Sequence, residues 1–229
     1  MENLQSDHLD TQNLYRDMQK RTGGEIYIGV VGPVRTGKST FIKRFMDVAV
    51  LPYMEDAAQK TRAQDELPQS AGGRTITTTE PKFIPQEAVE LKLAGEVTIR
   101  VRLVDCVGFM VEGAAGHLED GAERLVKTPW YDHEIPFTQA AELGTRKVIT
   151  DHSTIGVVVT TDGSFSDLPQ ETYLDAENQA ISELKKLHKP FLVLVNSSHP
   201  SSRTAREAAE RIEKQHSVAA MPVNCAQRR

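Results

Sequence analysis

The segment from Gly32 to Ser39 has residue types and spacing that suit a phosphate-binding loop, because it follows the pattern G-x-x-x-x-G-K-S. Glycines let a backbone wrap so that its N–H groups face anionic oxygens, and a following helix adds a partial positive charge. A lysine at this position reaches the β- and γ-phosphates of a nucleotide, and a serine hydroxyl ligates magnesium. The predicted nucleotide-binding residues here are Gly32, Arg35, Thr36, Gly37, Lys38, Ser39 and Thr40. The alternative is a glycine turn that leads into a helix and holds no ligand.

A second candidate is Asp105, which ends a predicted strand and is followed three residues later by Gly108. An acid at this point can hold magnesium beside Ser39, directly or through water. The N–H of Gly108 can bind a γ-phosphate. We therefore predict Ser39 and Asp105 as magnesium ligands and Gly108 as a nucleotide contact, although D-x-x-G alone is also a common turn.

A third candidate is the threonine run from Thr77 to Thr79, between the loop and Asp105. Nucleotide switches of this kind place a threonine there, with its hydroxyl on magnesium and its backbone near the γ-phosphate. The residues alone do not choose among the three threonines, and a threonine-rich strand edge is the alternative.

Two further positions bear on the base and on hydrolysis. Guanine-specific relatives carry Asn-Lys-x-Asp after a later buried strand, whereas this chain has Asn196 followed by Ser-Ser-His. The aspartate that would accept two guanine N–H groups is missing, which favours ATP and leaves Asn196 as a predicted nucleotide contact. Phe109 occupies the position at which many GTPases have a water-orienting glutamine, so another group must orient the water.

Alternating strands and helices would position these residues. Nearly continuous apolar runs predict buried strands over 25–31, 154–162 and 190–198. Alternation over 88–108 predicts a hairpin around Ala94-Gly95. Helices are predicted over 38–51, 136–152, 171–189 and 201–216, a last strand within 217–225, and loops over 52–80 and 109–136. We expect a three-layer α/β domain with a mainly parallel sheet over 23–229, preceded by a polar leader over 1–22.

Composition narrows the class of protein. The net charge of −5 over 229 residues points to no nucleic-acid partner. There is no apolar run of membrane-spanning length and no apolar signal core in the first residues, so we expect a cytoplasmic protein. Cys106 and Cys225 have no metal-type spacing and predict no disulfide framework.

From about Arg21 onward the sequence resembles the stage IV sporulation protein A family, the ATPases that build the basement layer of the spore coat. The stretches that carry the resemblance include "RTGGEIYIGVVGPVRTGKSTFIKRFM", "GGRTITTTEPKF", "VRLVDCVG", "TPWYDHEIPF" and "KPFLVLVNS". The resemblance implies a fold related to translation-factor-type GTPases, with ATP and Mg²⁺ as ligands. It also implies that Lys38, Thr78, Thr79 and Asp105 take part in catalysis, with Thr78 a magnesium ligand and the two threonines needed for hydrolysis.

The resemblance implies partners as well: self-assembly into a homopolymer, other coat proteins, and recruitment to the forespore surface by a membrane-associated protein. Family members are about twice this long, so we expect the ATPase domain alone, and recruitment is attributed to the missing part. Three hypotheses therefore stay open. The chain is a magnesium-dependent ATPase, a nucleotide-binding interaction module with little hydrolysis, or a GTP-type switch.

Overall fold

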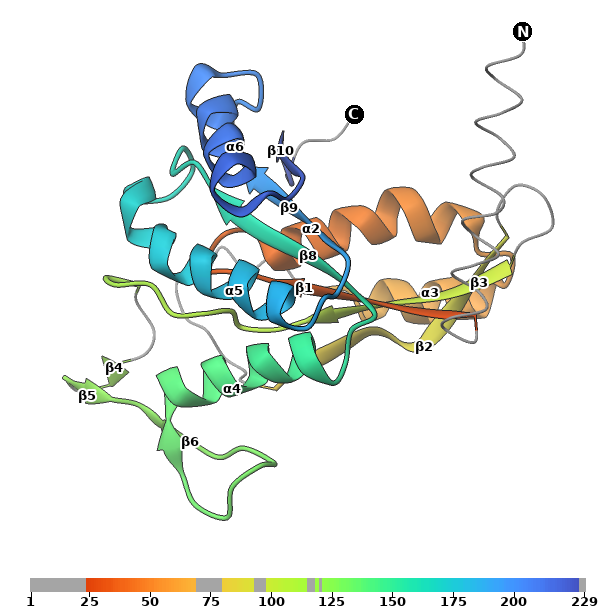
Figure 1. Ribbon diagram of the computed structural model, residues 1–229. Helices are drawn as coiled ribbons and strands as arrows, with labels where there is room; N and C mark the ends of the chain where they lie inside the picture. Colours follow the sequence, from red (N-terminus) through yellow and green to blue (C-terminus); the bar gives the residue numbers. More distant parts are fainter. Residues whose placement is uncertain (1–23, 69–79, 93–97, 115–117, 120, 227–229) are drawn as a thin grey trace, which may run out of the picture.

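The computed structural model describes residues 24–68, 80–92, 98–114, 118–119 and 121–226 (Figure 1). Its centre is a six-stranded sheet in the order β10-β9-β8-β1-β3-β2. These strands are β1 (Glu25–Val31), β2 (Lys82–Lys92), β3 (Thr98–Asp105), β8 (Ile155–Thr161), β9 (Phe191–Asn196) and β10 (Ala220–Val223). All neighbours pair in parallel except β2 and β3, which are antiparallel.

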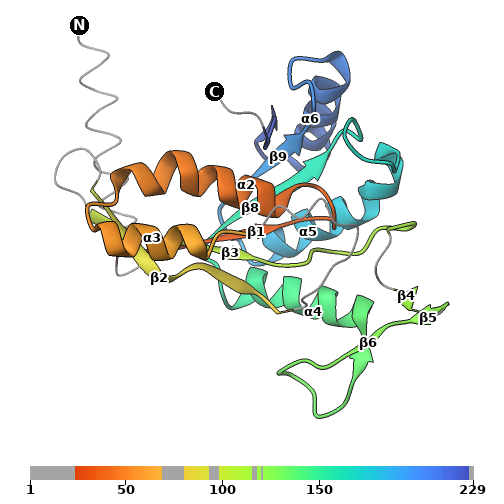
Figure 2. The ribbon, with the colours of Figure 1, turned by 180° about the vertical axis from the view of Figure 1, so that it is seen from behind.

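Helices cover both faces of this sheet, as Figures 1 and 2 show from opposite sides. The helices are α2 (Lys38–Phe45), α3 (Ala57–Asp65), α4 (Phe137–Thr150), α5 (Leu174–Lys186) and α6 (Arg203–His216). One hydrophobic cluster lies between the sheet and α4, α5 and α6, and a second lies between the sheet and α2 and α3. The prediction of a three-layer α/β domain with a mainly parallel sheet is confirmed.

The order of the strands decides where a ligand can bind. In the sheet, β3 lies on one side of β1, and β8, β9 and β10 lie on the other side. The direction of winding therefore reverses at β1, and the carboxyl ends of strands beside such a reversal form a crevice in open α/β sheets. Gly32 to Ser39 follow β1 at this edge, and Asp105 is the last residue of β3.

The predicted strands and helices lie close to their expected bounds. The buried strands 25–31, 154–162 and 190–198 are β1, β8 and β9. The hairpin predicted over 88–108 is the β2–β3 pair, but β2 begins earlier than predicted, at Lys82. The turn at Ala94-Gly95 lies outside the described residues. The helix predicted over 38–51 is α2 continued by a π-helical turn, Met46–Val50, and a short 3-10 helix, Leu51–Tyr53.

The loop predicted over 52–80 is wrong in part, because α3 forms within it. The Asp56 carboxylate caps this helix by accepting hydrogen bonds from the N–H groups of Ala58 (2.8 Å) and Gln59 (3.0 Å). Ala63 is its one buried residue, so the sequence has no apolar periodicity that would reveal a helix.

The segment 109–136 is irregular in its described part, as predicted. It contains only two-residue strands: β4 (Leu118–Glu119), β5 (Ala122–Glu123), β6 (Leu125–Val126) and β7 (Ile135–Pro136). Across the residues that the structure describes, no helix combines the length and apolar character needed to cross a membrane.

Candidate nucleotide-binding site

The glycine-rich loop is held at the carboxyl edge of the sheet by its own side chains. The Thr36 hydroxyl is fully buried and lies within hydrogen-bond distance of two carbonyl oxygens, those of Pro33 (3.0 Å) and of Val159 on β8 (2.7 Å). Arg35 has a φ of 61°, a left-handed conformation that is uncommon outside glycine. Such turns bring successive N–H groups to one side of the backbone and form an anion-binding concavity.

Asn196 packs directly against this loop. Its side-chain amide donates to the Thr36 carbonyl (2.9 Å), and its carbonyl oxygen accepts the N–H of Cys225 (3.0 Å). A Cβ atom on Gly37 would lie 2.4 Å from the Asn196 amide nitrogen, so only glycine permits this approach. The structure thus brings Asn196 to the loop, where it links β9 to the start of α2 and to the segment after β10.

Lys38 is a buried cation, with 4% of its surface exposed. Its ammonium group donates to the Pro33 carbonyl at 2.6 Å, a neutral acceptor inside the same loop. Burial lowers the pKa of Lys38, and the nearby Cys106 and Asp105 oppose that shift. A phosphate oxygen would supply the negative charge that favours the protonated form.

Ser39 and Asp105 meet although 66 residues separate them in the chain. The Ser39 hydroxyl donates to one Asp105 carboxylate oxygen at 2.7 Å. The other oxygen, Oδ1, is buried and has no hydrogen-bond partner among the described residues. Burial raises the pKa of Asp105, whereas the hydrogen bond from Ser39 and the charge of Lys38 lower it. A hydroxyl and a carboxylate with a free oxygen are the donors that Mg²⁺ prefers, so the residues fit this ion.

Gly108 and Phe109 lie against the phosphate-binding loop. The Phe109 N–H donates to the Gly32 carbonyl (3.1 Å), and the Phe109 carbonyl accepts the N–H of Val34 (2.9 Å). A Cβ atom on Gly108 would lie 2.5 Å from the Lys38 ammonium nitrogen, so glycine is required here for space as well as for its φ of 102°. The phenyl ring of Phe109 is buried, with 1% exposed.

The structure therefore brings together Gly32, Thr36, Gly37, Lys38, Ser39, Asp105, Gly108 and Asn196. Arg35 and Thr40 lie half-buried at the same loop and helix start. Thr77, Thr78 and Thr79 lie outside the described residues, so their roles stay predictions, as do the roles assigned to the other site residues.

Two contacts escaped prediction from the sequence. Thr145 on α4 accepts the N–H of Gly108 through its hydroxyl oxygen (3.1 Å), and Cys225 reaches Asn196 through its backbone. A threonine inside an amphipathic helix carries no signal of such a contact. The backbone N–H of Cys225 is a group that every residue except proline has, so no residue type could reveal it.

The segment after β9 differs from a guanine-binding site in its side chains. The hydroxyls of Ser197 and Ser164 lie 3.3 Å apart, and the N–H of Ser198 donates to the Ser164 hydroxyl (2.8 Å). His199, at the position of the guanine-binding aspartate, has an exposed side chain and donates its own N–H to Ser197. No carboxylate is supplied at this position.

The parallel sheet, the reversal at β1 and the loop between β1 and α2 define a nucleotide-binding domain of the P-loop class. Residues 9–229 match the family described as "Stage IV sporulation protein A, ATPase domain", and the chain belongs to this family.

Its relatives are similar over most of this chain but are much longer. This chain is 51% identical over 212 residues to stage IV sporulation protein A of Clostridioides difficile (strain 630). The aligned residues make up 93% of this chain and 43% of that protein. It is 48% identical over 210 residues to the protein of the same name from Bacillus anthracis. That alignment covers 92% of this chain and 43% of the Bacillus anthracis protein. The chain thus spans less than half the length of these relatives. A crystal structure of an SsGBP mutation variant aligns over 95% of this chain and 55% of that chain, at 13% identity and a TM-score of 0.47.

Proposed function

We propose that this domain binds Mg²⁺–ATP at the glycine-rich loop and hydrolyses it to ADP and phosphate. The observation that carries the proposal is the meeting of Lys38, Ser39 and Asp105 at the carboxyl edge of the sheet. Among the described residues, the one hydrogen-bond acceptor of the Lys38 ammonium group is a neutral carbonyl, and one oxygen of Asp105 has no partner. Family membership supports the same reaction.

In this proposal each residue has a separate task. Lys38 and the N–H groups of the loop bind the phosphates and oppose their negative charge, and Gly108 donates its N–H to the terminal phosphate. Ser39 and Asp105 hold magnesium, and Thr78 and Thr79 are the sensor threonines. When bound, magnesium neutralises charge that develops on the phosphates.

ATP is the proposed nucleotide because the position of the guanine-reading carboxylate carries His199. An imidazole cannot accept two N–H groups side by side as a carboxylate does. We further propose that hydrolysis is coupled to self-assembly in the spore coat basement layer, at the forespore surface in the mother-cell cytoplasm, as the family resemblance implies. The names of the relatives support a role in sporulation.

Release of phosphate from ATP and from GTP by the purified chain, with and without Mg²⁺, tests the proposal. We expect magnesium-dependent release from ATP, slower release from GTP, and a loss of at least about 100-fold in Lys38→Ala. Lys43→Ala is the matched control, because Lys43 lies exposed on the same helix and should keep full activity. No release above the Lys38→Ala level would overturn the proposed hydrolysis.

Phe109 favours a second candidate, a nucleotide-binding interaction module with little turnover. Its buried ring occupies the position from which a glutamine would orient water, so the described part of this segment offers no such group there. Nucleotide binding without phosphate release, unchanged by the double substitution Thr78→Ala and Thr79→Ala, would favour this candidate. A light-scattering assay with ATP and with ADP would then show whether binding alone promotes assembly.

A further inference from the structure

The N–H of Gly108 already has an acceptor inside the protein. It donates to the hydroxyl oxygen of Thr145 at 3.1 Å, and this hydroxyl in turn donates to the Ala141 carbonyl at 2.8 Å. Thr145 is completely buried. The two bonds satisfy the hydroxyl as donor and as acceptor, so it is a well-oriented acceptor for the Gly108 N–H.

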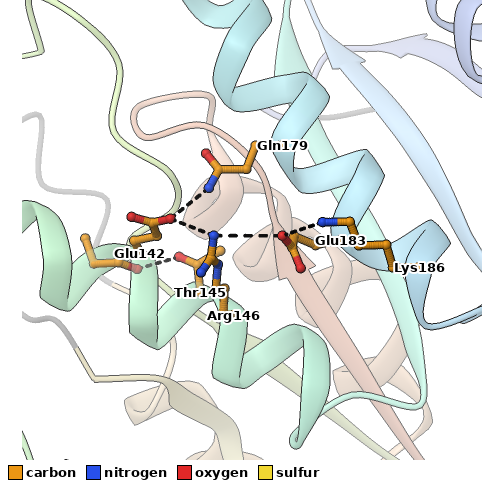
Figure 3. Close-up of polar contacts among 7 residues, drawn as sticks. Glu142, Thr145, Arg146, Gln179, Glu183 and Lys186 are labelled. Carbon is orange, nitrogen blue, oxygen red and sulfur yellow. Dashed lines mark hydrogen bonds and ion pairs between the residues drawn. The ribbon is translucent and has the colours of Figure 1, made fainter.

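Thr145 sits on α4, which packs on the sheet and makes polar contacts with the neighbouring helix α5. Figure 3 shows polar contacts between α4 and α5 on either side of Thr145 in the sequence. The Gln179 amide donates to Glu142 (2.9 Å), and Arg146 lies 2.9 Å from Glu142 and 3.8 Å from Glu183. The buried side of α4 packs on the sheet through Val148 and Ile149. The acceptor is therefore fixed in place.

Gly108 lies between this acceptor and the phosphate-binding loop. Its α-carbon faces the Lys38 ammonium group, whereas its N–H points to Thr145. A single N–H in a water-poor site makes one strong hydrogen bond at a time, and the proposed terminal phosphate also requires this N–H. Glycine has the backbone freedom to turn the peptide between two such acceptors.

We propose that Thr145 is a positioning residue that holds the Gly108 N–H in the ligand-free and ADP-bound states and releases it to the terminal phosphate of ATP. This inference rests on the proposed function, because it requires a nucleotide in the glycine-rich loop. Thr145 thereby lowers the preference of the site for ATP over ADP, since every ATP that binds must first break the Gly108–Thr145 bond.

The direction of the effect of Thr145→Val follows from this exchange. Valine has the shape of threonine but no acceptor, so in the ligand-free and ADP-bound states the Gly108 N–H loses its hydroxyl acceptor and keeps the much weaker Cys106 sulfur. It is satisfied again by the terminal phosphate. We expect binding of a non-hydrolysable ATP analogue to tighten roughly tenfold, with ADP affinity unchanged, because a poorly paired buried donor is costly by about this factor.

The experiment measures the dissociation constants of ADP and of a non-hydrolysable ATP analogue, both with Mg²⁺, for the full chain and its variants. Thr145→Ser keeps the hydroxyl and should keep the original ratio of the two constants. Thr160→Val is the matched control, because Thr160 is also fully buried but donates to Glu177, away from Gly108. It should lower stability and leave the ratio unchanged.

A ratio that is unchanged in Thr145→Val, or changed equally in Thr160→Val, would overturn the proposal. If Thr145→Val does not fold, the wild-type chain still decides. The backbone amide resonance of Gly108 should be the same with ADP as without ligand and should move with the ATP analogue, and a resonance that stays in place would refute the exchange. Failure of the proposed function is separate, because the wild-type chain would then bind neither nucleotide.

Discussion

Two sites of this domain that contain charged side chains differ in how those charges are balanced. Between α5, α6 and β8, Glu177 is 1% exposed and accepts hydrogen bonds from Thr160 (2.7 Å) and from the Arg211 guanidinium (2.7 Å). At the proposed nucleotide-binding site, Lys38 donates to a neutral carbonyl, and Asp105 accepts a hydrogen bond from the neutral hydroxyl of Ser39.

The difference separates a structural site from the site that we propose binds a ligand. A buried charge that has a counter-ion and hydrogen bonds is stable within the fold. Lys38 is buried and Asp105 is half-buried, and each has a neutral group as its hydrogen-bond partner. These charges make the ligand-free protein less stable than it would be without them. Under the proposed function, phosphates and magnesium would provide opposite charges, and their binding would restore this stability. Substitutions at the two sites should therefore have opposite effects on the ligand-free protein.

The largest expected effect is at the balanced site. Arg211→Ala leaves the Glu177 carboxylate buried without its counter-ion, and we expect the free energy of unfolding to fall by about 3 kcal/mol. Urea denaturation of the ligand-free protein measures it. Arg206→Ala, at an exposed position on the same helix, is the control and should leave the denaturation midpoint unchanged. Equal losses in both variants would mean that the ion pair with Glu177 contributes nothing.

A smaller effect of opposite sign is expected at the nucleotide-binding site. Asp105→Asn removes a negative charge from a half-buried side chain whose Oδ1 atom is buried. We expect the ligand-free protein to gain on the order of 1 kcal/mol at pH 7, while magnesium-dependent phosphate release is lost. Asp47→Asn, exposed on the helical turn after α2, is the control.

The pH dependence of this gain has a definite sign. Because burial raises the pKa of Asp105 in the folded state, its carboxyl favours folding at pH values below its unfolded pKa of about 4. That contribution is lost as the pH rises through the folded pKa. The advantage of Asp105→Asn should therefore shrink between pH 7 and pH 4 in urea titrations, and an advantage that grows toward low pH would contradict it.

The smallest effect is expected where charges meet on the surface. Arg146 lies near Glu142 and Glu183 between α4 and α5, with about half of its side chain exposed. Arg146→Ala should lower the free energy of unfolding by about 0.5 kcal/mol, and added salt should reduce the difference further. A loss as large as that of Arg211→Ala would show that exposure does not weaken this pair.

The sequence predicted the sheet well because its strands are buried. The runs in β1, β8 and β9 are rich in valine and isoleucine, which is typical of parallel strands covered on both faces. It predicted the glycine-rich loop for a related reason, since wrapping backbone around phosphates requires particular residue types at fixed spacing. It missed α3, whose exposed polar residues have no apolar period and whose start depends on the cap of Asp56.

The sequence by itself determined which residues could do chemistry. Lys38 and Ser39 belong to one short motif, and Asp105 and Gly108 belong to another, and both motifs can be recognised from a few neighbouring residues. Only the tertiary structure decided what these residues contact. It set the 2.7 Å bond between Ser39 and Asp105, the burial of Lys38, and the bond from Gly108 to Thr145. The physical reason is that burial and hydrogen bonding between distant segments depend on how the sheet and helices pack. A short sequence motif does not determine that packing.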